Sequence, residues 1–336
     1  MTTLKAFRRR VFENLQTLKA RKARQAGEPE LTLVNQIKDH ERAISLIDRA
    51  LATEPTAVTL TQLKQQLRPL VIAANVEQLD VDEIALEQPK LYFEPETVPI
   101  SGGKFSMGSV AGPDVPPAET PQDEVNLATF HIGTYPVTND QYAEFIRQTG
   151  RIVEPDLLWD GQQPPDDKLN YPVTGVTWIE ALAYCQWLAE QTSRNYTLPT
   201  EAQWEKAARG ADGRTFPWGS YWADGRCNTS IDQITPVDAY PAQNEFGCFD
   251  MVGNAREWTS SLWGSKRSVP DPAYAYPWTD DARRHDTAAP SHIRRVYRGG
   301  ATEAVIDMRC SRRGSYLPDK PGPRRHRHGF RVVLNL

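Results

Sequence analysis

The sequence predicts an α+β protein in which a small α-helical bundle precedes a larger domain with few regular elements. Up to about residue 84, apolar residues recur at helical spacing, whereas beyond residue 100 short apolar runs alternate with Gly, Pro, Asn and Asp. All nine tryptophans lie in that later part. The predicted organisation is therefore a helical bundle over 1–84, a linker over 85–96 and a second domain over 97–336.

The helices expected in the first part each present one apolar face. The faces consist of Phe7, Val11, Leu15 and Leu18, then Leu33, Ile37, Ile44, Ile47 and Leu51, then Val58, Leu60, Leu63, Leu67 and Leu70. Segments 25–29 and 53–56 carry the Gly and Pro expected of connectors. Such a bundle is near the lower size limit for independent stability, so we expect it to self-associate, to pack on the second domain or to recruit an effector protein.

A Pro-punctuated acidic segment over 85–96 predicts the linker. In the second domain, three helices are expected to begin at capping boxes, where a Thr and a Glu or Gln satisfy the first backbone N–H groups reciprocally. The pairs are Thr138 with Gln141, Thr177 with Glu180, and Thr200 with Gln203. Short strands are expected at 128–132, 296–298 and 330–334.

The bulk composition is that of an ordinary soluble globular chain. Its 336 residues are 39% hydrophobic and 24% charged, with a formal net charge of -4. A net negative charge provides no general attraction to nucleic acid or to an anionic membrane. No run of about 18 apolar residues predicts a membrane span, and no apolar signal-peptide core follows the basic residues 1–25. We therefore expect a cytoplasmic protein with no nucleic-acid or membrane partner.

The four cysteines are widely spaced and form no C-x-x-C pair. They are Cys185, Cys227, Cys248 and Cys310. This spacing suits neither a zinc site nor a dense set of disulfides. Because free cysteine is among the most buried residue types, reduced and mostly buried thiols are expected.

Eight ordered blocks of sequence run through the second domain. They lie at 102–109, 135–139, 172–178, 198–210, 216–219, 250–258 (Asp-Met-Val-Gly-Asn-Ala-Arg-Glu-Trp), 298–300 and 329–332. Together they resemble the formylglycine-generating enzyme family, also called sulfatase-modifying factors, across residues 97–336. The resemblance implies a C-type-lectin-like fold, with two helices against twisted antiparallel sheets and a large loop region.

The resemblance also implies two structural calcium sites. The first would consist of the Asp250 and Glu257 side chains and the carbonyls of Gly253 and Ala255. The second would consist of Asn228, Thr229 and, at less regular spacing, Asp232. Carboxylate and carbonyl oxygens are the ligands that calcium prefers. The alternative interpretation is that these groups simply hydrogen-bond the turns that carry them.

The catalytic chemistry of the family is not expected in this chain. Its oxidases resemble one another in a pair of cysteines just after the Gly-Gly, which bind copper as thiolates, the soft ligands that Cu(I) requires. Here the interval 301–310 is shorter and holds Cys310 alone, at the position of a structural strand, so neither copper nor formylglycine generation is expected. A second branch resembles ergothioneine-type sulfoxide synthases with an H-x-x-x-H-x-E iron site. Residues 1–95 contain only His40, which we interpret as a helix surface or interface residue.

One dense positive segment offers a candidate ligand site. It consists of Arg324, Arg325, His326, Arg327 and His328, and we group it with Arg309 and Arg313. Arginine clusters receive carboxylates, phosphates or acidic peptide segments. A solvated loop is the alternative interpretation.

Three functional hypotheses follow. The first, which we favour, is a non-catalytic ligand- or protein-binding scaffold whose loops at about 262–295 and 301–328 face a protein or peptide. Segment 33–40 looks like helical modules fused to bacterial signalling and conflict proteins, which favours a signalling or defence context. The second is the variable ligand-binding protein of a diversity-generating retroelement, with varied positions between Gly300 and Gly329. The third is an enzyme of the same family that uses a non-cysteine site.

Overall fold

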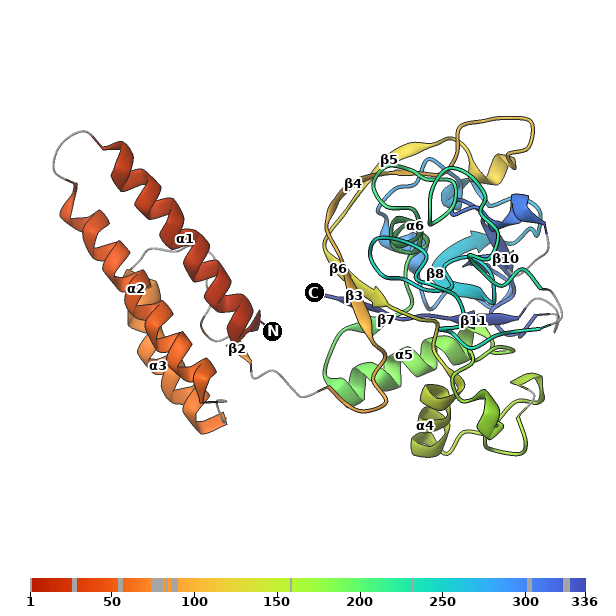
Figure 1. The fold of residues 1–336 in the computed structure, drawn as a ribbon, viewed down its shortest axis with the longest axis horizontal. Coiled ribbons are helices and arrows are strands. Elements are labelled where there is room, and N and C mark those ends of the chain that lie inside the picture. Colours follow the sequence, from red (N-terminus) through yellow and green to blue (C-terminus); the bar gives the residue numbers. More distant parts are fainter. Residues whose placement is uncertain are drawn as a thin grey trace. The chain divides into compact units, whose positions relative to one another are not determined.

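The computed structural model describes residues 2–25, 29–53, 57–73, 81, 84–85, 90–157, 159–230, 233–300, 304–322 and 327–336. The chain divides into two compact units, Met1–Pro89 and Lys90–Leu336. Figure 1 follows the chain from the helical first unit to the mixed second unit. The boundary between the units falls inside the segment predicted as a linker. Among the described helices, none is long and apolar enough to cross a lipid bilayer.

The first unit is built from helices α1 (Leu4–Arg24), α2 (Leu31–Ala52) and α3 (Ala57–Ala73). Their predicted apolar faces meet in one buried cluster that includes Phe7 and Val11 of α1, Ile47 of α2, and Leu63 and Leu67 of α3. Two short strands, β1 (Thr2–Thr3) and β2 (Ile84–Ala85), pair in parallel. The predicted N-terminal helices are confirmed. His40 is buried on α2, with Nδ1 2.9 Å from the Gln36 carbonyl oxygen, so it is not a surface residue.

The second unit contains two four-stranded sheets and one two-stranded ribbon within its described residues. The first sheet has the order β3 (Thr97–Ile100), β6 (Phe130–Gly133), β12 (Val333–Asn335) and β7 (Tyr196–Thr197). The second has the order β10 (Gly314–Tyr316), β9 (Arg294–Arg298), β8 (Arg256–Gly264) and β11 (His328–Phe330). The ribbon pairs β4 (Gly103–Met107) with β5 (Asp123–Leu127). The α+β fold class with preceding helices is confirmed.

The strand predicted at 330–334 is divided between the two sheets. Phe330 ends β11, which runs parallel to β8, whereas Val333 begins β12, which runs antiparallel to β6. The chain crosses between the sheets at Arg331 and Val332, both fully buried. A continuous apolar run does not reveal such a crossing, because both strands and the connection are buried. The parallel β8–β11 pair also departs from the antiparallel sheets that the resemblance implied.

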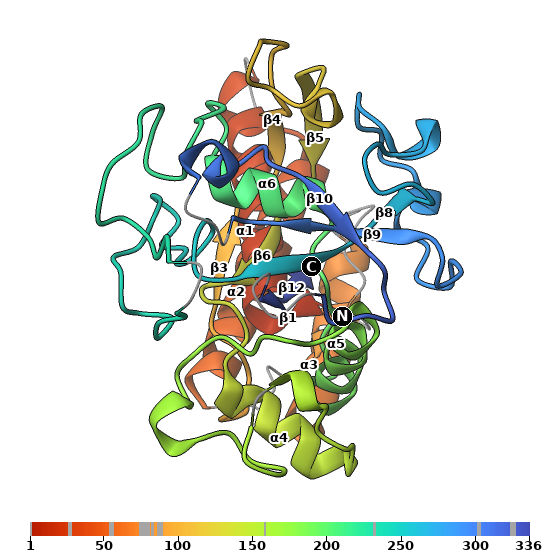
Figure 2. The same cartoon turned by 90° about the vertical axis from the view of Figure 1, so that its right-hand side faces the viewer.

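The helices of the second unit begin where the capping boxes predicted. They are α4 (Asn139–Thr149), α5 (Trp178–Thr192) and α6 (Glu201–Arg209), and each has both hydrogen bonds of the capping box. In Figure 2, α6 lies above strands β8 and β9, while α4 and α5 lie below them. Short 3-10 turns occur at Pro117–Glu119, Pro155–Leu157, Asp166–Lys168, Pro272–Tyr274, Ala282–His285 and Val305–Met308.

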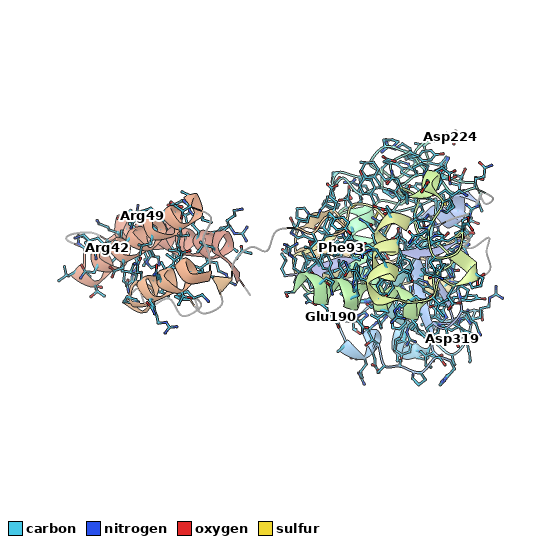
Figure 3. All side chains as sticks on the ribbon, turned by 90° about the horizontal axis from the view of Figure 1, so that it is seen from below. Arg42, Arg49, Phe93, Glu190, Asp224 and Asp319 are labelled. Carbon is cyan, nitrogen blue, oxygen red and sulfur yellow. The ribbon has the colours of Figure 1, made fainter. Side chains whose placement is uncertain are left out.

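An aromatic core joins α4 and α5 to the C-terminal strands. Tyr184 of α5 stacks on Tyr142 of α4 at a centroid distance of 5.9 Å and meets the edge of Phe330 at 5.3 Å. Phe93, from the predicted linker, stacks on Trp187 at 5.0 Å and is buried. Figure 3 labels Phe93 among the side chains of the second unit. The second unit therefore begins earlier than predicted, because Phe93 belongs to its core.

Candidate functional site

The Gly299-Gly300 pair that follows β9 anchors the turn at Gly253. The Gly253 N–H donates to the Gly300 carbonyl oxygen at 2.6 Å. Downstream, the N–H of Cys310 donates to the Thr215 carbonyl oxygen at 2.9 Å, and Cys310 is fully buried. Cys310 therefore packs in the core. This agrees with its position in the sequence, where the family has a structural strand.

The thiols of this protein lie in its core. All four cysteines fall within the described residues, and all are free and buried. Burial raises the pKa of Cys227 and of Cys310 to about 12, that of Cys248 to about 11, and that of Cys185 still further. A nucleophilic or metal-binding cysteine acts as the thiolate. No cluster of three or more His, Cys, Asp or Glu suited to a metal occurs in the described ranges.

A network of buried ion pairs links α6 to β9. Arg298 Nη2 donates to Glu205 at 2.5 Å and lies 3.6 Å from Glu201. Glu205 also accepts from Arg209 at 2.7 Å. Burial acts to raise the pKa of Glu205, but the charges of Arg298 and Arg209 outweigh it and hold that pKa below its usual range. The network is therefore charged and internally compensated at neutral pH.

Arg313 and Arg309 extend this network instead of lining an open surface. Arg313 Nη2 donates to Glu201 at 2.8 Å, and its guanidinium lies 4.2 Å from the centre of the Tyr276 ring. Arg309 Nη2 donates to Glu119 at 3.3 Å. Both arginines are buried, and their charges are met by internal carboxylates. At these two predicted ligand-binding residues the structure thus shows buried guanidinium groups that pair inside the protein.

The basic segment near the C-terminus is only partly described. Arg324, Arg325 and His326 lie outside the described residues. Arg327 donates to the Ser230 carbonyl oxygen at 3.3 Å. His328 is fully buried, with its ring 4.7 Å from that of Trp258 and 4.8 Å from that of Tyr297. His328 therefore packs against two aromatic rings of the fold.

The two predicted calcium sets converge on Asn254, which belongs to the 250–258 block but was not among the predicted ligands. Asn254 Nδ2 donates to Asp250 at 2.7 Å, and its Oδ1 accepts from Asn228 Nδ2 at 3.2 Å. Asp250 and Asn254 have φ values of 50° and 58°, in the left-handed region that Asp and Asn tolerate best. The Gly253 carbonyl accepts from the Ala255 N–H at 2.7 Å. These hydrogen bonds shape the turn that carries the predicted calcium ligands.

Glu257 contributes to a separate buried ion pair. Its carboxylate accepts from Arg331 Nε at 2.6 Å and Nη2 at 2.7 Å, and from Trp204 Nε1 at 2.6 Å. All three side chains are fully buried. The Glu257 charge is thus already compensated without a metal. Thr229 is half-buried beside Asn228, and Asp232 lies outside the described residues.

The negative charge of the Asp250 carboxylate is balanced less completely than that of Glu257. Burial raises its pKa to about 7, and the hydrogen bond from Asn254 and the charge of Arg331 oppose this rise only in part. A nearby cation would favour the ionised form. The Asp250 carboxylate and the adjacent carbonyls therefore fit a hard, oxygen-ligated cation, whereas Glu257 fits one less well because Arg331 already neutralises it.

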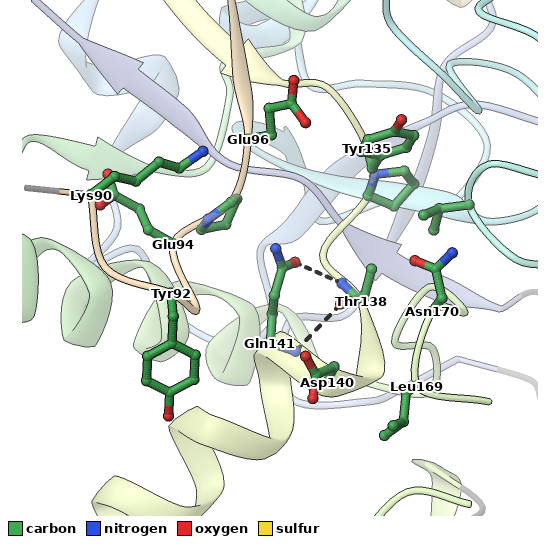
Figure 4. A pocket seen from close by; sticks show the side chains of 13 residues that line it. Lys90, Tyr92, Glu94, Glu96, Tyr135, Thr138, Asp140, Gln141, Leu169 and Asn170 are labelled. Carbon is green, nitrogen blue, oxygen red and sulfur yellow. Dashed lines mark hydrogen bonds between the residues drawn. The ribbon is translucent and has the colours of Figure 1, made fainter. Parts of the chain in front are cut away.

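A surface pocket of about 410 Å³ lies between the segment before β3 and the start of α4. Figure 4 shows Lys90, Tyr92 and Glu94 on one side of it and Tyr135 and Asn170 on the other. The capping box that starts α4 lines the space between them. Sequence reasoning missed this pocket, because its lining comes from four distant stretches of chain that share no motif.

The two-sheet fold and the docked Gly-Gly turn place the sequence blocks of the formylglycine-generating enzyme family in one domain. Residues 83–336 match the family model for the sulfatase-modifying factor enzyme 1-like domain. The chain therefore belongs to this family.

Relatives and solved structures agree with that assignment. The chain is 32% identical over 219 residues to the inactive C-alpha-formylglycine-generating enzyme 2 of Bos taurus, covering 49% of this chain and 70% of that protein. It is 27% identical over 340 residues to the serine/threonine-protein kinase Pkn1 of Chlamydia trachomatis, covering 90% of this chain and 50% of the kinase. The structure of PvdO from Pseudomonas aeruginosa superimposes with a TM-score of 0.56 at 25% identity, covering 73% of this chain and 96% of that one.

Proposed function

We propose that this chain is a non-catalytic binding or scaffold protein built on a formylglycine-generating-enzyme-like domain. The observation that carries the proposal is the burial of all four cysteines with raised pKa values. Copper-dependent oxidation of a substrate cysteine requires a pair of accessible thiolate ligands, whereas these four thiols are buried and only Cys310 follows the Gly-Gly pair. A relative named as inactive, at 32% identity, supports the same conclusion.

The test is an oxidase assay on the full chain. The protein is incubated with a Cys-containing sulfatase-type peptide, Cu(I) and oxygen, and the peptide mass is followed, with a formylglycine-generating enzyme run in parallel. The expected result is an unchanged peptide in the presence of this chain and conversion by the reference enzyme. Conversion by this chain would overturn the proposal. If conversion occurred and persisted in a Cys310→Ala variant, an enzyme with a non-cysteine site would replace it.

The helical unit gives the scaffold a second binding element. Residues 1–73 hold 13 Lys and Arg against 7 Asp and Glu, whereas residues 74–89 of the same unit add five Asp and Glu and no Lys or Arg, so the unit as a whole has a net charge of +1. The basic residues are therefore concentrated in the stretch that holds the three helices, which favours an acidic partner surface there, and such attraction weakens with salt. A kinase relative that aligns over 90% of this chain supports a signalling context. Light scattering of the full chain at low and high salt tests self-association, the other role proposed for this unit.

Calcium is proposed as a structural ion at the Asp250 turn. The support is the buried Asp250 carboxyl, whose pKa is raised to about 7 by burial. Calcium would supply charge there and would take part in no chemical step. Calorimetric titration of the EDTA-treated protein with calcium chloride tests the proposal, and the absence of binding at about pH 8, above the raised pKa, would refute it.

A further inference from the structure

The pocket beside α4 is held together by backbone hydrogen bonds between separate segments. The Thr134 N–H donates to the Glu96 carbonyl oxygen at 2.8 Å, which joins the segment before β3 to the segment after β6. The Asp140 N–H donates to the Leu169 carbonyl oxygen at 3.1 Å, and the Val237 N–H to the Asn170 carbonyl oxygen at 2.9 Å. Since these bonds fix the backbone around the pocket, a ligand would meet a pre-formed site.

The carboxylates of the pocket differ in their availability. Glu94 is buried and accepts from Tyr196 Oη at 2.6 Å and from Arg194. Glu96 and Asp140 are exposed, and in the described structure no hydrogen bond or ion pair engages either carboxylate. The charges of Glu96 and Asp140 are therefore open to a ligand, whereas that of Glu94 is already used.

Tyr135 adds an aromatic wall in a negative field. Its ring is half-buried, and it packs against Phe249 at a centroid distance of 4.6 Å. Burial raises the pKa of Tyr135, and the negative charges of Glu96 and Asp238 raise it further. Asp238 is held by Asn170 Nδ2 at 2.9 Å. An aromatic ring between carboxylates attracts a cation, because the charges and the ring quadrupole act in the same direction.

The lining of the pocket favours a planar cation on an apolar stem. A guanidinium group stacks on aromatic rings and donates to a carboxylate in a bidentate manner, whereas an ammonium is a compact, strongly hydrated charge. Leu169 and Val237 give the lining an apolar part for the methylene stem. Lys90 stands on the far side from Tyr135 in Figure 4, so it leaves the Tyr135 side to the ligand cation.

We infer that this pocket binds the guanidinium group of an arginine side chain on a peptide segment of a partner protein. The inference rests on the proposed function of a binding protein and adds its ligand chemistry. The arginine stacks on Tyr135 and pairs with Glu96 or Asp140. No residue of the buried ion-pair network takes part.

The experiment uses the full chain and three fluorescein-labelled Gly-Ser hexapeptides that differ only at a central residue, which is Arg, Lys or citrulline. Citrulline keeps the shape of arginine without its charge. Fluorescence anisotropy at low salt should show the Arg peptide binding at least about tenfold more tightly than the citrulline peptide, the ratio expected for one charge-assisted contact. The double variant Glu96→Gln/Asp140→Asn should lose this preference. Glu190→Gln, an exposed change on α5 outside the pocket, should retain it.

Two outcomes would overturn the inference. One is equal binding of the Arg and citrulline peptides to the unmodified chain, and the other is an unchanged Arg preference in the double variant. If free arginine amide displaced the peptide at an equal concentration, the pocket would bind a free arginine derivative as well as a peptide, and the inference of a peptide ligand would be wrong. The oxidase assay distinguishes failure of this inference from failure of the proposed function. If the chain oxidises no peptide and shows no Arg preference, only the inference about the pocket fails. If the chain oxidises the peptide, the proposed non-catalytic function fails.

Discussion

Replacing Asp250 with Asn should stabilise the second unit at neutral and alkaline pH when no divalent cation is bound. Burial raises the pKa of Asp250 from 3.8 to about 7 in the folded state. Between these values the unfolded chain has released the proton while the folded chain retains it, so folding becomes less favourable as pH rises. A shift of this size corresponds to about 4 kcal/mol above pH 7, and almost nothing below pH 4. Asparagine keeps the shape and an oxygen acceptor for Asn254 but removes the charge.

The assay is urea unfolding of the Asp250→Asn variant and the unmodified chain in EDTA, at about pH 4 and about pH 8. Tryptophan fluorescence reports the second unit alone, because all nine tryptophans lie beyond residue 100. We expect nearly equal stabilities at the lower pH and a more stable variant at the higher pH, by up to about 4 kcal/mol. A Glu190→Gln variant, which changes an exposed carboxylate, controls for the loss of one negative charge.

Repeating the urea unfolding with calcium tests the proposed ion at Asp250. If the proposed ion binds at Asp250, calcium at the higher pH should stabilise the unmodified chain and leave the variant unaffected, because the ion binds the folded state through the ionised carboxylate. A variant less stable than the unmodified chain in EDTA at the higher pH would refute the reasoning. It would show that hydrogen bonds and Arg331 already compensate the ionised carboxylate.

Further predictions concern the core. Glu257→Gln should lose about 3 to 5 kcal/mol in urea unfolding, because it leaves Arg331 buried without a carboxylate; a loss below about 1 kcal/mol, the range of exposed ion pairs, would contradict this. Iodoacetamide should label none of the cysteines in the native protein and all of them in denaturant, as mass spectrometry can show, and native labelling at neutral pH would contradict the raised thiol pKa values. Gly175→Ala should lower the unfolding temperature more than Gly150→Ala. Both glycines have positive φ, but a Cβ at Gly175 would lie 2.2 Å from the Asp156 carbonyl oxygen and one at Gly150 would meet open space; equal losses would show that φ alone decides.

The helix starts were predictable because their cause is local. At Thr138, Thr177 and Thr200 the reciprocal hydrogen bonds join residues three positions apart, so the sequence contains both partners side by side. The burial of the cysteines was predictable from residue type. The division of 330–334 between two sheets was not, because pairing with β8 or β6 depends on where distant strands lie.

Arginine positions illustrate the limit most clearly. Arg309 and Arg313 stand in a basic stretch that resembles a ligand surface, yet their carboxylates are supplied by Glu119 and Glu201, 190 and 112 residues away. Local sequence records a charge but not its partner. The same reason hid the pocket beside α4, whose Glu96, Tyr135 and Asn170 meet only after the first sheet has formed.

The sequence by itself determined the helical beginning, the helix starts, the family and the single cysteine that follows the Gly-Gly pair, since these depend on residue types and short spacings. Only the tertiary structure decided which charged groups form ion pairs inside the core, that Asn254 joins the two predicted calcium sets, and which carboxylates stay exposed at the surface. The physical reason is that burial and ion pairing are properties of groups brought together over long separations of chain, and folding alone brings them together.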